Sequence, residues 1–356
     1  MGRSEKGRLF IGGLTLAKKI ITAESVARAK IVAKAVDDIG IRQGSKAHKK
    51  LIDIFNTVKP DGAPMTYTAP WCDAYVSALA IETFGKEAAK EYFPLSYNCN
   101  TTIAKAQKMG IWKETDSYKP KPADLILYDW DDSGRGENKN SADHIGIVRY
   151  VTSDSIHVIE GNKGVTEQVG ERIIPINGRY IRGFVTPKYD RVTIQGRIIR
   201  EADEMAKKAI KDKMIYDGSA THNTYNKAKK TDKRANCATL ASYILQAVKV
   251  LPLNRRIWLS DKINGSGATT LRKRSTVIHP KNKRTKDVMH QLEPGDLVGY
   301  SWKGNVHTMI YHHKEGRRVY WFTGGGSDFK AKKLIRRRPF YYFKRVDIIV
   351  KVKQPD

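Results

Sequence analysis

Two segments of the chain have the composition or apolar spacing of a helix, and each begins at a cysteine. Residues 73–92, which follow Cys72, are rich in Ala, Leu and Glu. In the second half, Cys237 opens a segment whose apolar residues recur at the i, i+3, i+4 and i+7 positions of an amphipathic helix. These residues are Leu240, Tyr243, Ile244, Ala247, Val248 and Leu251. The pattern therefore predicts a cysteine at the N-terminus of a helix in each half.

Each predicted helix is followed by the same series of strands. A turn with Pro and Asp leads into an apolar strand, a histidine opens a second strand, and a polar turn leads into a return strand. The segments are residues 122–127, 144–151 and 156–160 in the first half and residues 294–299, 307–311 and 319–322 in the second. His144 lies 72 residues after its cysteine, and His307 lies 70 residues after its own. One layout therefore occurs twice, although the two halves differ in detailed sequence.

The strand pairing expected in the first hairpin brings polar side chains to the histidine. If Tyr150 pairs with Ile156, His144 lies opposite Asn162, and Glu160 is one diagonal step away on the partner strand. The first half therefore predicts a partner for the imidazole ring.

The second hairpin predicts no such partner on its return strand. Pairing of His312 with Val319 would place His307 opposite Gly324, where no carboxylate or amide stands. Backbone carbonyls of this glycine-rich turn or the side chain of Asp328 could orient the ring instead, and the sequence does not decide between them.

This order of residues meets the needs of a cysteine nucleophile. A thiol attacks a carbonyl carbon as thiolate, and both a helix N-terminus and a nearby imidazolium lower its pKa. The histidine takes and returns the proton, while a third group holds its ring in place. We predict this chemistry for Cys72 with His144, oriented by Glu160 or Asn162.

We predict the same roles for Cys237 and His307 in the second half, whereas Cys99 has no such context and is predicted to be structural. Three cysteines without a C-x-x-C motif indicate neither a disulfide framework nor a zinc site, so we expect no metal and no cofactor. An acidic segment offers oxygen ligands for calcium, but its spacing is not that of an EF-hand and favours a solvated insertion. Its residues are Asp129, Asp131, Asp132 and Glu137.

Positive charge is concentrated in the second half of the chain. The 356 residues include 65 Lys and Arg against 37 Asp and Glu, a net charge of +28. Residues 51–190 hold 16 basic and 19 acidic side chains, whereas residues 191–356 hold 37 and 14. Such a surface is typical of a protein that binds a polyanion: nucleic acid, teichoic acid or anionic lipid.

Length and charge together predict three parts: a basic N-terminal helical arm over residues 1–40, a first domain over 41–190 and a strongly basic second domain over 191–356. The longest apolar stretches are far shorter than the roughly 18 residues of a membrane span. The N-terminus shows no signal peptide, because its apolar stretch is short and interrupted by Lys18 and Lys19. We therefore expect no membrane span and synthesis in a host cytoplasm.

The motifs of the first half resemble the CHAP family of cysteine- and histidine-dependent amidohydrolases and peptidases. The matching motifs are A-P-W-C at residues 69–72, P-A-D-L at 122–125, D-H-I-G-I-V at 143–148 and V-I-E-G-N at 158–162. The resemblance covers about residues 45–187. It implies a papain-like α+β fold and cleavage of amide bonds in peptidoglycan, either within its peptides or at the muramoyl-L-alanine link. It further implies Cys72 as nucleophile, His144 as general base and acid, Glu160 as orienting group and Asn162 as a further polar partner.

The second half, at about residues 200–350, is similar to the NlpC-type cell-wall peptidases. The matching motifs are N-C-A-T-L-A-S-Y at residues 236–243, E-P-G-D-L-V at 293–298 and V-H-T-M-I-Y at 306–311. In that family a third polar residue is expected on the return strand, which here falls near Thr323. The resemblance implies a second papain-like domain with a cysteine-bearing helix packed on a histidine-bearing antiparallel sheet.

Two such units in one chain resemble a bacteriophage lysin, which reaches the cell wall through a holin or as part of a virion. The expected function is peptidoglycan hydrolysis, with anionic wall polymers such as teichoic acid as a second partner of the basic half. Two alternatives use the same features differently. One is a nucleic-acid-binding virion protein, although no zinc-finger spacing, RNP-like motif or recognition helix is evident. The other is a papain-like acyltransferase or deamidase that uses the same thiol chemistry.

Overall fold

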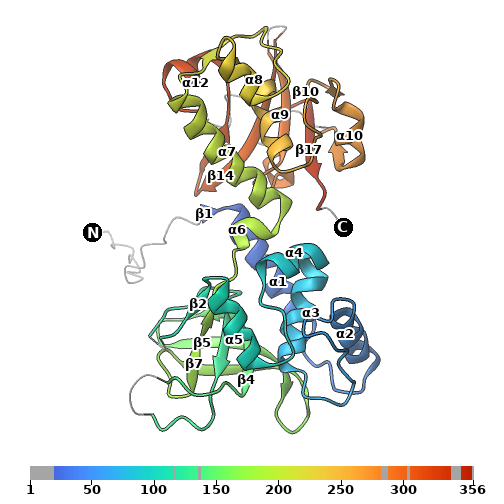
Figure 1. Ribbon diagram of the computed structural model, residues 1–356, viewed down its shortest axis with the longest axis vertical. Coiled ribbons are helices and arrows are strands. Elements are labelled where there is room, and N and C mark those ends of the chain that lie inside the picture. The colour runs from blue at the N-terminus through green and yellow to red at the C-terminus, as the bar shows by residue number, and fades with distance from the viewer. Residues whose placement is uncertain are drawn as a thin grey trace, which may run out of the picture.

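The computed structural model describes residues 20–115, 117–134, 138–281, 288–302, 305–337 and 346–354. Two lobes lie one above the other in Figure 1, with the first half of the chain in the lower lobe and the second half in the upper. Each lobe combines helices with an antiparallel sheet, so the predicted α+β class is confirmed. In each lobe a helix that begins with a cysteine packs against a strand that carries a histidine, which is the papain-like arrangement.

The lower lobe surrounds a six-stranded sheet in the order β2-β7-β3-β4-β5-β6. Its helices are α2 (Lys46–Asn56), α3 (Cys72–Phe84), α4 (Lys86–Tyr92), α5 (Cys99–Lys108) and α6 (Tyr189–Val192). Its strands are β2 (Trp112–Lys113), β3 (Leu125–Tyr128), β4 (His144–Val151), β5 (Ser155–Lys163), β6 (Gln168–Pro175) and β7 (Ile181–Val185). Helix α3 is apolar around nearly its whole circumference, so it is buried between α2 on one side and β4 and β5 on the other.

The upper lobe contains a sheet whose main path runs β12-β17-β13-β14-β15-β16. Its helices are α7 (Ile194–Lys211), α8 (Tyr225–Lys230), α9 (Cys237–Ala247), α10 (Ala268–Lys273), the 3-10 turn η1 (Met289–Gln291) and α12 (Gly326–Lys330). The strands of this sheet are β12 (Ser275–Ile278), β13 (Leu297–Trp302), β14 (Asn305–Glu315), β15 (Arg318–Phe322), β16 (Ile335–Arg337) and β17 (Ile348–Val352). Two short pairs stand apart from it: β8 (Ile215–Tyr216) with β9 (Arg234–Ala235), and β10 (Trp258–Leu259) with β11 (Ile263–Asn264). The strand order matches that of the lower lobe position by position, so the repeated layout of the sequence is also a structural repeat.

Three local predictions were wrong. The single helix expected over residues 73–92 is broken by Gly85, whose φ of 83° ends α3 before α4 begins. In the first hairpin Tyr150 pairs with His157 rather than Ile156, because a bulge follows Val148. The bulge leaves the predicted register intact nearer the histidine, where Ile147 pairs with Ile159.

In the second hairpin, the predicted pairing of His312 with Val319 does not form. Tyr311 pairs with Trp321, and a bulge then brings Val319 opposite Lys314. The observed register shifts the position opposite His307 by one residue, from Gly324 to Gly325.

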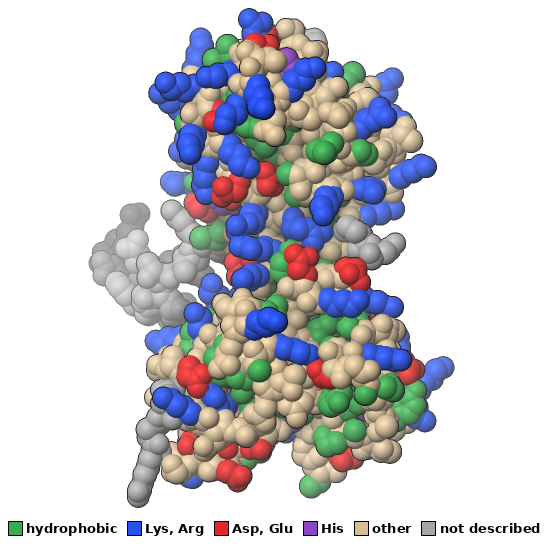
Figure 2. Space-filling model, viewed as in Figure 1, with side chains coloured by type: hydrophobic (Ala, Val, Ile, Leu, Met, Phe, Trp, Pro, Cys, Tyr) green, Lys and Arg blue, Asp and Glu red, His purple; other side chains and the backbone are tan. Residues whose placement is uncertain are grey.

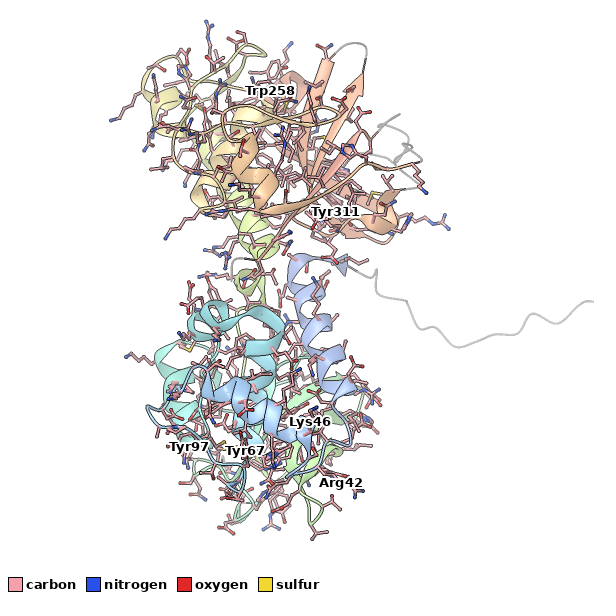
Figure 3. All side chains as sticks on the ribbon, turned by 90° about the vertical axis from the view of Figure 1, so that its right-hand side faces the viewer. Arg42, Lys46, Tyr67, Tyr97, Trp258 and Tyr311 are labelled. Carbon is pink, nitrogen blue, oxygen red and sulfur yellow. The ribbon has the colours of Figure 1, made fainter. Side chains whose placement is uncertain are left out.

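An N-terminal segment contacts both lobes. Strand β1 (Ile20–Ile21) pairs with the end of β14, and helix α1 (Ala23–Asp37) follows it and runs down along the lower lobe in Figure 3. The helix packs into the core of that lobe and also contacts α7. Arg28 of α1 donates a 2.8 Å hydrogen bond to the buried carboxylate of Asp124 in the lower lobe. Lys30 forms a 3.3 Å ion pair with Glu293 of the upper lobe. Residues 1–19 of the predicted arm lie outside the described residues.

Within the described ranges, no helix has the length and apolar character needed to cross a membrane.

Candidate active site

Cys72 begins helix α3 and is almost fully buried, with 8% of its surface exposed. A hydrogen bond from the Cys99 thiol lowers the pKa of Cys72 most, burial opposes this effect, and a hydrogen bond and the charge of His144 lower the pKa further. The backbone N–H of Asp73, in the first turn of α3, also favours the thiolate. Together these contacts hold the pKa of Cys72 well below its ordinary value and favour the thiolate, the form that a cysteine nucleophile requires.

His144 begins strand β4 and lies between Cys72 and Glu160. Its Nε2 is 3.3 Å from Glu160 Oε2, an ion-pair distance, although no aligned hydrogen bond to Nε2 is found in the described part of the chain. The other ring nitrogen, Nδ1, is therefore the one available to Cys72. Burial favours the neutral ring, but the interactions of the ring with Cys72 and with the Glu160 carboxylate outweigh it and raise the pKa of His144 to about 9.

Glu160 is completely buried and is held by an arginine from the neighbouring strand. Arg172 Nε donates to Glu160 Oε1 at 2.7 Å and to Oε2 at 3.0 Å. Burial raises the pKa of Glu160, but the nearby His144 ring and the hydrogen bonds from Arg172 prevail and lower it below its ordinary value. The ionised form of Glu160 is therefore favoured, and its carboxylate lies beside the His144 ring.

Asn162 lies two residues further along β5, in the left-handed region with φ of 52°. Its Oδ1 is buried and has no hydrogen-bond partner among the described residues. The structure thus brings Cys72, His144 and Glu160 together, and Asn162 lines the same pocket as His144.

The structure places Cys99, which the sequence predicts to be structural, in contact with Cys72. It begins α5, and it lies against Cys72 because two side chains of the same turn anchor the neighbouring elements. Thr102 donates a 2.7 Å hydrogen bond to Asp73, and Asn100 accepts one of 2.9 Å from the backbone of Ala142, two residues before His144. The hydrogen bond to Cys72 and then burial raise the pKa of Cys99, so this thiol stays protonated and donates. No sequence signal showed this contact, because it depends on packing between two helices.

A pocket of about 230 Å³ opens beside the histidine. Its lining residues are Trp130, His144, Asn162, Gly164 and Arg172. The Trp130 ring stacks on Tyr128 with centroids 4.8 Å apart, and the backbone N–H of Trp130 donates to the Asp143 carboxylate. An aromatic wall therefore stands on one side of the pocket, fixed to the residue that precedes His144.

Cys237 repeats the position of Cys72 but not its ionisation state. It begins α9, whose capping box is formed by Asn236 and Thr239, and only 8% of it is exposed. Burial raises the pKa of Cys237, while backbone hydrogen bonds from Thr308 and from the start of α9 oppose this only in part. In this structure the second thiol is therefore a neutral group at the ordinary pH of a cell.

His307 lies on β14 and stacks on Tyr300 of β13 at 5.2 Å, as His144 lies opposite Tyr128 in the lower lobe. A side chain at Gly325 would lie 3.7 Å from His307 Cε1 and 3.2 Å from Asp328 Oδ2, so the Asp328 carboxylate lies near the ring. Thr323, the expected third polar residue, instead donates a hydrogen bond of 2.5 Å to Asp328. The two possible partners of His307 are thus joined to each other.

The part of the chain that the structure describes contains no group of three or more His, Cys, Asp or Glu side chains placed to hold a metal ion. Of the acidic segment considered for calcium, Glu137 lies outside the described residues. The carbonyl of Asp132 accepts hydrogen bonds from Arg179 at 2.9 and 2.6 Å, which places a cation of the protein itself in this segment.

The CHAP domain family matches residues 63–162 of the chain, a range that contains Cys72, His144, Glu160 and Asn162. The predicted resemblance of the first half to this family of cysteine- and histidine-dependent amidohydrolases is confirmed over these residues. A solved structure of NlpC2 from Trichomonas vaginalis is similar at a TM-score of 0.24 and 13% sequence identity, covering 67% of this chain and 96% of that chain. A likeness at this level assigns no function to either lobe. No curated protein matches the sequence.

Proposed function

We propose that the lower lobe, with its CHAP domain, hydrolyses amide bonds of peptidoglycan through Cys72, as an endopeptidase or an N-acetylmuramoyl-L-alanine amidase. The observation that carries this proposal is the pairing of two side chains with opposite pKa shifts: the pKa of Cys72 is lowered and that of His144 is raised. The buried carboxylate of Glu160 lies 3.3 Å from the His144 ring and favours its charged form. A thiol and an imidazole with ordinary pKa values would both be neutral at pH 7.5 and would need a proton transfer before attack.

In the first half of the reaction, the Cys72 thiolate attacks the carbonyl carbon of the amide and forms a tetrahedral intermediate. The His144 imidazolium gives its proton to the amide nitrogen, the C–N bond breaks, and an amine leaves a thioester on Cys72. His144 is then neutral and takes a proton from water, whose oxygen attacks the thioester. The thiolate leaves, the carboxylic acid departs, and the ion pair of Cys72 with His144 is restored.

For the upper lobe we infer binding to an anionic wall polymer such as teichoic acid. Lys and Arg side chains cover much of the visible face of this lobe in Figure 2, whereas the lower lobe shows mixed charges. Within this lobe, the short helix α8 alone carries Lys227, Lys229 and Lys230. The raised pKa of Cys237 supports a binding role over the catalytic role predicted for Cys237 and His307. A bacteriophage lysin, delivered through a holin or in a virion, is the setting that this pair of roles fits best.

Turbidity loss of purified bacterial walls, with mass spectrometry of the released fragments, tests both roles. We expect Cys72→Ala to abolish release and Cys237→Ala to release the same fragments as the wild type. If each variant loses a different fragment, the upper lobe is a second cutting enzyme. Full wall lysis by the double variant would exclude cysteine catalysis in both lobes.

A further inference from the structure

Arg172 lines the pocket beside His144, and it takes no part in the proposed reaction steps. Arg172 pairs with Glu160 through its Nε alone. In the described part of the chain, neither terminal amine of this guanidinium has a hydrogen-bond partner. Because an arginine carries five N–H donors in a rigid plane, the Nε contact fixes the direction of the remaining four.

Two contacts hold the guanidinium in this orientation. Its central carbon lies 4.8 Å from the centre of the Trp130 ring, so the ring covers one face of the group. Glu160, completely buried, holds the edge that carries Nε. About one third of the Arg172 side chain remains exposed, and this part lines the pocket. The free amines are thus ordered before any ligand arrives, which lowers the entropic cost of binding.

The pocket has a positive character although Arg172 is paired. Its described lining residues include no carboxylate, since Glu160 lies behind the ring and the guanidinium and has no exposed surface. The lining instead offers Arg172, the His144 ring, the Asn162 amide and an aromatic wall. Such a set fits a planar anion that two parallel N–H groups of one arginine can bind.

We propose that Arg172 forms an anion subsite beside the catalytic histidine and binds a carboxylate of the peptide substrate close to the scissile amide. This inference rests on the proposed peptidoglycan hydrolysis and gives it a specificity. Peptidoglycan peptides carry such a group at the γ-linked glutamate, whose α-carboxyl is either free or converted to an amide. The subsite selects the free carboxylate, because an amide offers one acceptor and no charge to the two amines.

The test compares two synthetic muramoyl peptides that differ only in this carboxylate or carboxamide. Calorimetry with Cys72→Ala protein measures binding without turnover. We expect the carboxylate peptide to bind at least about tenfold more tightly, with a difference that shrinks as salt is added. In Cys72→Ala/Arg172→Gln protein the ratio of the two affinities falls to about one. Because both peptides meet the same protein, a general loss of stability changes both affinities and leaves their ratio.

Arg149→Gln is the matched control. Like Arg172, Arg149 pairs with a glutamate of another strand of the sheet, in this case Glu171 of β6. Arg149 does not line this pocket. We expect the Arg149 variant to keep the preference. Equal binding of the two peptides to Cys72→Ala protein, or a preference that survives Arg172→Gln, would overturn the subsite while leaving peptidoglycan hydrolysis intact. If the preference holds but wild type cleaves neither peptides nor walls, the subsite stands and the proposed hydrolysis fails.

Discussion

Replacing Glu160 by glutamine should move the alkaline limit of activity to lower pH. The carboxylate is one of two groups that raise the pKa of His144 to about 9, and the amide keeps its shape without its charge. At pH 8 an imidazole with that pKa is roughly 90% protonated, whereas one with the ordinary value near 6.5 is roughly 3% protonated. The Cys72 thiolate still favours the protonated ring, so the loss of rate at pH 8 should lie between about threefold and thirtyfold.

The pH dependence separates this effect from damage to the fold. At pH 6 both proteins keep most of His144 protonated, so Glu160→Gln should lose less than about twofold there. Wall-fragment release between pH 5 and 10 gives the profile, and alkylation of Cys72 by iodoacetamide, followed by peptide mapping, reports the thiolate without substrate. Glu171→Gln is the control, because it removes a glutamate of the neighbouring strand β6 that pairs with Arg149. An equal loss at pH 6 and pH 8, or an unchanged alkaline limit, would refute the assignment of Glu160.

Three further substitutions test the surroundings of the site. Arg28→Ala leaves the fully buried Asp124 without its cation, so the free energy of unfolding in urea should fall by about 3 kcal/mol. Lys30→Ala removes only the exposed pair with Glu293 and should lower it by less than about 1 kcal/mol. Gly161→Ala would place a methyl group 2.6 Å from Tyr75 Cβ, so it should lower the free energy of unfolding by about 1–3 kcal/mol and lower wall lysis. In Gly170→Ala the methyl group meets only the flexible Lys163 side chain at 3.1 Å, so stability and lysis should change little. Cys99→Ala removes the hydrogen-bond donor that lowers the pKa of Cys72, so the acid limit of Cys72 alkylation should move to higher pH. Cys99→Ser keeps a donor and should move this limit less, and an unchanged limit in both variants would argue against the hydrogen bond from Cys99 to Cys72.

The sequence predicted the helices and strands that carry the site residues better than it predicted the pairing between the strands. Cysteine at a helix start and histidine at a strand start are local features, and alternation along a strand carries Glu160 to the histidine. The bulge after Val148 could not be predicted, because either strand of a hairpin can absorb an extra residue. The pairs nearest to His144 nevertheless have the predicted register, with Ile147 opposite Ile159, since the bulge lies further along β4.

Contacts between segments distant in the chain escaped the sequence analysis. Arg172 lies 12 residues after Glu160 and reaches it across two adjacent strands, and nothing in its neighbours distinguishes it from other exposed arginines. Cys99 likewise depends on how α5 packs against α3. Both residues act on the ionisation of the site, so a motif can identify a nucleophile and a base without showing what sets their pKa values.

The two lobes show how one topology can support different states of the same pair of residues. Each places a cysteine at a helix start and a histidine opposite a tyrosine of the neighbouring strand. In the lower lobe the carboxylate near the histidine comes from the return strand and is held by Arg172. In the upper lobe Asp328 comes from helix α12, and Thr323, the Gly325 backbone and Arg336 all bind its oxygens. A carboxylate with three such partners has less of its charge available to an imidazole. The two lobes therefore differ in the segment after the return strand, and substitutions in that segment test whether the thiol of Cys237 can be activated.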